Sequence, residues 1–199
     1  MKACSPCSTI TSTSDFPLVC VTQRHLAERP FLEQMERILT VKPQAIILRE
    51  KDLSEAEYET LAEKVLPLCR QQKVPCLLHN FYEAYRKLQA DGLHLPLAKL
   101  RKLSAQQRKE IPVLGASCHS LDDVVEAAGL GATYVTFGHV YATSCKPGLE
   151  PRGIAALREV CQKSSLPVYA IGGVTPEKAG ELQAAGAAGA MLMSYFMRL

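Results

Sequence analysis

Short apolar runs rich in β-branched residues alternate along this chain with longer segments whose apolar residues recur at helical spacing. Eight of the short runs predict strands, at 18–21, 45–48, 75–78, 92–95, 112–116, 133–137, 167–171 and 190–193. The segments between them predict helices, at 30–39, 54–72, 82–89, 97–109, 120–128, 153–163 and 176–185. This alternation is typical of βα units joined in a parallel sheet.

Eight consecutive βα units predict an α/β fold, a compact (β/α)8 TIM barrel in which the loops after the strands form the active site. An open doubly wound sheet is the alternative, although no G-x-G-x-x-G follows the first strand. We expect a single barrel domain over 17–199, preceded by a flexible leader over 1–16 that is rich in Ser and Thr.

The last predicted strand lies close to the end of the chain, since only five residues follow Ser194. We therefore expect the eighth helix to be missing or reduced to a single turn. The outer faces of the first and last strands would then lack their helical cover, which a partner subunit or the leader would supply. A homodimer is the arrangement that we expect.

Composition and charge narrow the classes of function. The chain has 199 residues, of which 47% are apolar and 22% charged, and its formal net charge is +3. Because the basic residues are scattered, nucleic acid is not an expected partner. No apolar run approaches the roughly 18 residues of a membrane span, so we expect a cytoplasmic protein without a membrane partner. Most of the eight cysteines are expected in the core, and a metal or redox role for the Cys4–Cys7 C-x-x-C pair is the less favoured interpretation.

Two segments carry candidate chemistry. Gly172 and Gly173 end a buried strand and, with Met193 and Ser194 after the last strand, match the phosphate site that barrels often build from their seventh and eighth loops. A tight turn is the simpler interpretation of a glycine pair. His139 begins a polar loop just beyond the sixth strand, where a group that titrates near neutral pH suits proton transfer.

Three runs of this chain resemble the thiamine phosphate synthase superfamily, and most closely its thiazole tautomerase (TenI-like) branch. The runs are GHVYATSCKPGLEPRG, AIGGVTPEKAGELQAAGAAGAMLMS and GASCHSLDDVVEAAGLGATYVTFG. The similarity extends from the first strand to the end of the chain and is strongest over 113–194. It implies a (β/α)8 barrel that acts on a thiazole phosphate.

The synthase branch joins a pyrimidine pyrophosphate to a thiazole phosphate with the help of Mg²⁺. Its pattern carries an Asp after the Asn that ends the third strand and a second Asp in the loop after the fourth. This chain has Phe81 at the first position, and Pro96, Leu97 and Ala98 around the second. None of these side chains offers the oxygen ligands that Mg²⁺ needs. The chain does resemble the synthase at Arg49, Lys51, Asn80, Ser117, Thr143 and Lys146.

The tautomerase branch has Gly-His after the sixth strand, as Gly138 and His139 do here, where the synthase usually has Gly-Pro. The resemblance implies that His139 shuttles a proton to aromatise a thiazole carboxylate phosphate tautomer, with no metal or other cofactor. Phosphate binding falls to the glycine pair with Met193 and Ser194. Arg49 is the first candidate for the substrate carboxylate, although an ion pair with Glu50 or with a neighbouring loop would also explain it. The substrate-binding candidates are Arg49, Lys51, Asn80, Ser117, Thr143 and Lys146.

Three interpretations stay open at this point. A thiazole tautomerase is favoured, a Mg²⁺-dependent thiamine phosphate synthase is the alternative, and a regulatory protein that binds the phosphate ligand without turnover is the third. His79 either lines the mouth of the barrel or has a structural role, and His94 lies within the shortest predicted strand.

Overall fold

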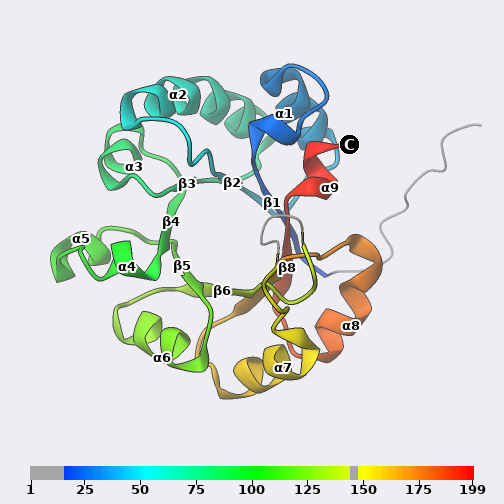
Figure 1. The fold of residues 1–199 in the computed structure, drawn as a ribbon. Helices are drawn as coiled ribbons and strands as arrows, with labels where there is room; N and C mark the ends of the chain where they lie inside the picture. The colour runs from blue at the N-terminus through cyan, green and yellow to red at the C-terminus, as the bar shows by residue number, and fades with distance from the viewer. Residues whose placement is uncertain (1–15, 144–147) are drawn as a thin grey trace, which may run out of the picture.

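In a computed structural model that describes residues 16–143 and 148–199, eight parallel strands pair in sequence order and close into a barrel (Figure 1). Each strand pairs with the next along the chain, and Cys20 of the first strand pairs with Leu192 of the last to close the ring. The predicted TIM barrel is confirmed. The strands are β1 (Leu18–Val21), β2 (Ala45–Leu48), β3 (Cys76–His79), β4 (Gly92–Pro96), β5 (Leu114–Cys118), β6 (Tyr134–Gly138), β7 (Val168–Ile171) and β8 (Gly189–Leu192).

Helices surround the barrel on its outer side (Figure 1). Alternate strand residues face them, so that Cys20, Ile46 and Leu78 pack outward under the helices while Val19 and Ile47 fill the barrel interior. The helices are η1 (Arg24–Leu26), α1 (Phe31–Thr40), α2 (Glu55–Gln72), α3 (Tyr82–Leu88), α4 (Leu97–Leu100), α5 (Ala105–Lys109), α6 (Leu121–Gly129), α7 (Gly153–Lys163), η2 (Pro176–Lys178), α8 (Ala179–Ala184) and α9 (Ser194–Met197).

The single helix predicted over 97–109 is wrong, because α4 ends at Leu100 and a new helix begins after Ser104. The Ser104 hydroxyl accepts a hydrogen bond from the Gln107 N–H (3.1 Å), and the Gln107 side chain accepts one from the Ser104 N–H (2.8 Å). This reciprocal pair is a capping box, which starts a helix and cannot lie inside one. The strand predicted over 112–116 is shifted as well, because the observed strand begins two residues later, at Leu114.

The eighth helix is reduced to the single turn of α9, as expected. Its residues Phe196 and Met197 are buried, and Figure 1 shows α9 beside α1. On α1, the Gln34 amide donates to the Phe196 carbonyl at 2.7 Å. The outward side chains of Cys20 and Leu192 are 0% and 1% exposed. These outer faces are therefore buried without a partner subunit, and Phe16, at the end of the predicted leader, belongs to the same buried cluster.

Several sequence features fall outside the described residues. These are Lys146, the Cys4–Cys7 pair and the leader over residues 1–15. Phe16, the first described residue, is buried. Among the residues that the structure does describe, no helix is long and apolar enough to cross a membrane.

Candidate active site

A cavity of about 820 Å³ opens at the carboxyl ends of the strands, and every strand of the barrel contributes to its wall. This is the face on which TIM barrels carry their active sites. The cavity brings together candidates that lie as far apart in sequence as the second and the eighth strand. The predicted residues that line it are Arg49, Lys51, Ser117, His139, Thr143, Gly172, Gly173, Met193 and Ser194.

Asn80 is not among the residues that line this cavity. It follows β3 with a positive φ of 80°, and both its N–H and its carbonyl form hydrogen bonds. Its N–H donates to the His94 carbonyl at 3.1 Å, and its carbonyl accepts from Lys99 Nζ at 3.3 Å. We therefore find Asn80 shaping the turn after β3, and its assignment to substrate binding remains a prediction.

His139 lines the cavity and is 6% exposed. Its Nε2 lies 3.1 Å from the Leu149 carbonyl, which can only accept a hydrogen bond, so Nε2 carries the proton. In the neutral ring, Nδ1 is then the unprotonated nitrogen. Nδ1 is buried and has no hydrogen-bond partner among residues 16–143 and 148–199. A buried nitrogen without a partner is costly, which marks it as a group held for another purpose.

The neighbouring glycines fix where His139 can lie. A Cβ on Gly172, whose φ is +93°, would come within 2.3 Å of the His139 Cβ. A Cβ on Gly138 would come within 2.0 Å of the Ile171 carbonyl oxygen. In the loop after β5, His119 donates from Nδ1 to the Gly138 carbonyl at 2.8 Å. The loops after β5, β6 and β7 therefore pack directly on the backbone that carries the imidazole.

The glycine pair after β7 turns its carbonyls away from the cavity. The Gly172 carbonyl accepts from the Tyr141 N–H at 3.0 Å, and the Gly173 carbonyl accepts from Lys178 Nζ at 3.0 Å. Lys178 also lies over the Tyr141 ring, 3.5 Å from its centroid. Neither glycine N–H has a main-chain partner among the described residues. Two free N–H groups in adjacent positions form the kind of concavity that binds an anion.

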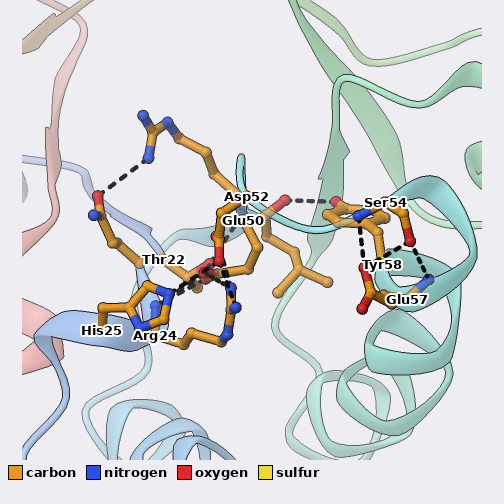
Figure 2. Close-up of polar contacts among 11 residues, drawn as sticks. Thr22, Arg24, His25, Glu50, Asp52, Ser54, Glu57 and Tyr58 are labelled. Atoms are coloured by element: carbon orange, nitrogen blue, oxygen red, sulfur yellow. Dashed lines mark hydrogen bonds and ion pairs between the residues drawn. The ribbon is translucent and has the colours of Figure 1, made fainter.

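A polar network on the rim holds the loops after β1 and β2 together (Figure 2). The buried Glu50 carboxylate accepts from the Thr22 hydroxyl at 2.7 Å and from the Arg24 N–H, and it pairs with the Arg24 guanidinium at 3.2 Å. Thr22 in turn accepts from the Arg49 N–H at 2.9 Å. Glu50 thus pairs with Arg24, and the part of the alternative that paired Arg49 with Glu50 is wrong.

The outer part of the same network is exposed. The hydrogen bond from Arg24 to Asp52 holds the pKa of that carboxyl well below its usual range, and His25 contributes in the same direction. The network leaves the Arg49 side chain beside Gln23, whose amide oxygen lies 3.4 Å from Arg49 Nη1, at the cavity wall.

Two buried histidines lie on the cavity floor; the sequence left the role of His79 open and assigned none to His94. His79 and His94 are register partners on β3 and β4, and both line the cavity. Burial lowers the pKa of His79 to about 2, with further contributions from His94 and Arg49. Burial and the Arg49 charge lower the pKa of His94 to about 4. Both rings are therefore neutral at physiological pH. Strand alternation was the available signal, since Leu77 faces the interior and His79 follows it by two.

The positions of the synthase's Mg²⁺ ligands are apolar in this structure. Phe81 packs against the Tyr58 ring with 4.9 Å between centroids, and Lys99 Nζ lies 5.3 Å from its face. Leu97 is buried. Within the described part of the chain, no group of three or more His, Cys, Asp and Glu side chains is placed to hold a metal ion. These residues do not fit Mg²⁺.

A closed barrel of eight βα units, with its cavity at the carboxyl ends of the strands, defines a TIM-barrel protein with the active-site face of an enzyme. The chain belongs to the thiamine monophosphate synthase (TMP-TENI) family, whose pattern it matches over residues 18–196, and it is thus a member of an enzyme family of thiamine biosynthesis.

Individual relatives agree with this assignment. The chain is 33% identical over 180 residues to a putative thiamine-phosphate synthase 2 from Aquifex aeolicus, covering 90% of this chain and 97% of that protein. It is 32% identical to a thiamine-phosphate synthase from Roseiflexus castenholzii, over 94% of this chain and 86% of that one. A solved thiamine phosphate pyrophosphorylase from Pyrococcus furiosus has a TM-score of 0.77 at 25% identity, over 92% of this chain and 87% of that one.

Proposed function

We propose that this protein is a thiazole tautomerase-like isomerase. It aromatises a thiazole carboxylate phosphate tautomer by moving a proton from the ring carbon that bears the carboxylate to the exocyclic carbon. The observation that carries the proposal is the state of His139, whose Nε2–H is held by the Leu149 carbonyl while the buried Nδ1 has no partner among the described residues.

The proton transfer uses this one ring in both directions. Nδ1 takes the proton from the ring carbon, and the electron pair of that C–H bond moves into the conjugated system, which places negative charge on the exocyclic carbon. The resulting imidazolium returns its proton to the exocyclic carbon, which leaves the product aromatic and His139 neutral. Throughout, the hydrogen bond from Nε2 to Leu149 keeps the ring oriented. General acid–base catalysis by one such group contributes roughly 10²- to 10⁴-fold.

The remaining cavity residues have binding roles in this proposal. Arg49 suits the substrate carboxylate because its planar fork matches two carboxylate oxygens, and Lys51 lines the same wall. The N–H groups of Gly172 and Gly173, which have no main-chain partner among the described residues, suit the phosphate together with Ser194, which lines the same cavity. The other substrate-binding candidates remain Asn80, Ser117, Thr143 and Lys146, with Met193 beside the phosphate.

Thiamine phosphate synthase is the second candidate, and the names of the relatives favour it. Against it stands the chemistry of the residues at the metal positions, where Phe81 and Leu97 provide no oxygen ligand. Glu177 is the acidic residue among the described residues that line the cavity. We derive no step through Mg²⁺ for this chain.

The deciding experiment follows the ultraviolet absorbance of the thiazole carboxylate phosphate tautomer with the full chain in the presence of a chelator. We expect rapid aromatisation by the wild type and a rate about 10²- to 10⁴-fold lower for His139→Gln, with affinity for the aromatic product changed less than about threefold. His25→Gln is the matched control, because His25 is 62% exposed on the rim and pairs with Asp52.

Each contrary result points to a different protein. An unchanged rate in His139→Gln would remove His139 from the chemistry. Condensation of a pyrimidine pyrophosphate with a thiazole phosphate that requires Mg²⁺ would establish the synthase. Tight binding of the aromatic product without turnover of the tautomer would establish a non-catalytic binding protein.

A further inference from the structure

Three neighbouring strands place a chain of hydrogen bonds beneath the cavity. The Tyr134 hydroxyl on β6 lies 2.9 Å from His94 Nδ1 on β4, and His94 Nε2 lies 2.9 Å from Ser117 Oγ on β5. Tyr134 belongs to the apolar cluster that fills the barrel interior, while His94 and Ser117 line the cavity. The chain thus leads from the centre of the barrel to the wall that a ligand touches.

A glycine makes room for this contact. A Cβ on Gly115, which lies on β5 between the other two strands, would come within 2.2 Å of Tyr134 Cζ and 2.4 Å of His94 Nδ1. Real Cβ atoms do not approach other atoms so closely. Any other residue at this position would therefore push the phenol and the imidazole apart.

The hydrogen bonds have one direction that satisfies every group. His94 is neutral, so only one of its ring nitrogens carries a proton. If Nδ1 carried it, Tyr134 would accept that bond, and its own buried hydroxyl proton would lack an acceptor among the described residues. If Nε2 carries it, Tyr134 donates to Nδ1 and Nε2 donates to Ser117 Oγ. The second arrangement leaves no buried donor unpaired.

We propose that Tyr134 and His94 are positioning residues that make Ser117 a hydrogen-bond donor toward the ligand. Because Nε2–H occupies a lone pair of Ser117 Oγ, the hydroxyl proton of Ser117 is turned toward the cavity. The wall at Ser117 therefore selects a ligand with a hydrogen-bond acceptor at that point, and it disfavours one that presents an N–H. This inference depends on the proposed function in one respect, the choice of a thiazole phosphate as the test ligand.

The direction of the chain is measured first, without any ligand. Long-range ¹H–¹⁵N NMR of the full-length protein, labelled at histidine, distinguishes the two tautomers of His94. We expect an unprotonated Nδ1 and a protonated Nε2, and in Tyr134→Phe a change of the Nδ1 shift toward that of a nitrogen without a hydrogen bond. A protonated Nδ1 in the wild type would overturn the proposal, whether or not the protein turns over a thiazole.

The coupling to Ser117 is then measured by affinity for the aromatic thiazole carboxylate phosphate. We expect Tyr134→Phe and Ser117→Ala each to weaken binding about 5- to 20-fold, and the double variant to bind no more weakly than Ser117→Ala alone. Tyr169→Phe is the control, since its hydroxyl bonds to Gln44 at 3.2 Å and takes no part in the chain. Equal losses from Tyr134→Phe with and without Ser117 would overturn the relay.

A second ligand shows which group of the thiazole accepts the hydrogen bond from Ser117. A thiazole phosphate that lacks the carboxylate keeps the ring nitrogen, so a Ser117→Ala loss of the same size with this ligand assigns the ring nitrogen to Ser117. Loss of the effect with this ligand assigns the carboxylate. If Ser117→Ala binds both ligands as tightly as the wild type, Ser117 is no donor and the proposal fails.

Discussion

Gly172 and Gly131 share a backbone conformation but differ in their surroundings. Both have a positive φ, of 93° and 85°, which strains any residue with a Cβ. A Cβ at position 131 meets nothing within 4 Å, whereas one at position 172 would collide with the backbone and Cβ of His139. The pair therefore separates the cost of the conformation from the cost of displacing His139.

We expect Gly131→Ala to lower the free energy of unfolding by about 1 kcal/mol and to leave the aromatisation rate unchanged. Gly172→Ala should cost about 2–4 kcal/mol, because overpacking adds to the same strain, and should reduce the rate more than tenfold. Urea denaturation and the absorbance assay on both variants measure this. Equal rates in the two variants would show that Gly172 does not set the position of His139.

At the scale of an element, one tyrosine ties α2 to two strands. The buried Tyr58 hydroxyl donates to the Leu48 carbonyl at 2.5 Å, at the carboxyl end of β2 (Figure 2). It also accepts from the His79 N–H at 2.8 Å, at the carboxyl end of β3. Helix α2 begins at a capping box formed by Ser54 and Glu57, one turn before this residue. The helix start and the strand ends are thus held in one register.

Tyr58→Phe removes the hydroxyl and leaves two buried main-chain groups without a partner. We expect it to lower the free energy of unfolding by about 2–4 kcal/mol, measured by urea denaturation. Tyr82→Phe on α3 is the control, since its hydroxyl bonds to the exposed Glu110 carboxylate, and a change below about 0.5 kcal/mol is expected. A loss as small for Tyr58→Phe would mean that water or a shifted strand replaces the hydroxyl.

At the scale of the whole molecule, the two buried histidines make folding sensitive to acid. In the unfolded chain, His79 and His94 become protonated as the pH falls below their ordinary pKa of 6.5. In the folded protein the pKa is about 2 for His79 and about 4 for His94, so both rings stay neutral to a lower pH. The unfolded state therefore binds more protons in this window. Stability is fully present above pH 6.5 and falls as the pH is lowered through 6 and 5.

We expect each histidine to contribute a slope of up to about 1.4 kcal/mol per pH unit between pH 6 and pH 5. Urea denaturation at half-unit steps measures the slope, and His79→Asn should reduce it by about half. This range lies above the pH at which the carboxylates titrate. A slope that His79→Asn leaves unchanged would show that other groups control the acid response.

The sequence predicted the order of strands and helices well because strand burial and helix caps are local signals. The eight apolar runs of the barrel and the short last helix followed from spacing alone. The break between α4 and α5 was missed because the Ser104 capping box sits inside a continuous helical pattern. The ion pair of Glu50 with Arg24 was missed, since Arg24 lies 26 residues away in sequence, in the loop after β1.

The sequence predicted those residues of the candidate site that directly follow a strand. His139 and the glycine pair directly follow β6 and β7, and the structure places them together in the cavity. The relay from Tyr134 to Ser117 was not predictable in this way. It depends on the register of β4, β5 and β6, and on the space that Gly115 leaves between them.

Among the described residues, the hydrogen-bond partner of the His139 imidazole is a main-chain carbonyl. Leu149 supplies that carbonyl, while its own side chain is 61% exposed. A side-chain partner is lost by one base change in its codon, whereas a peptide carbonyl is present whichever residue occupies the position. The tautomer of His139 therefore depends on the path of the backbone at position 149 and not on the side chain there.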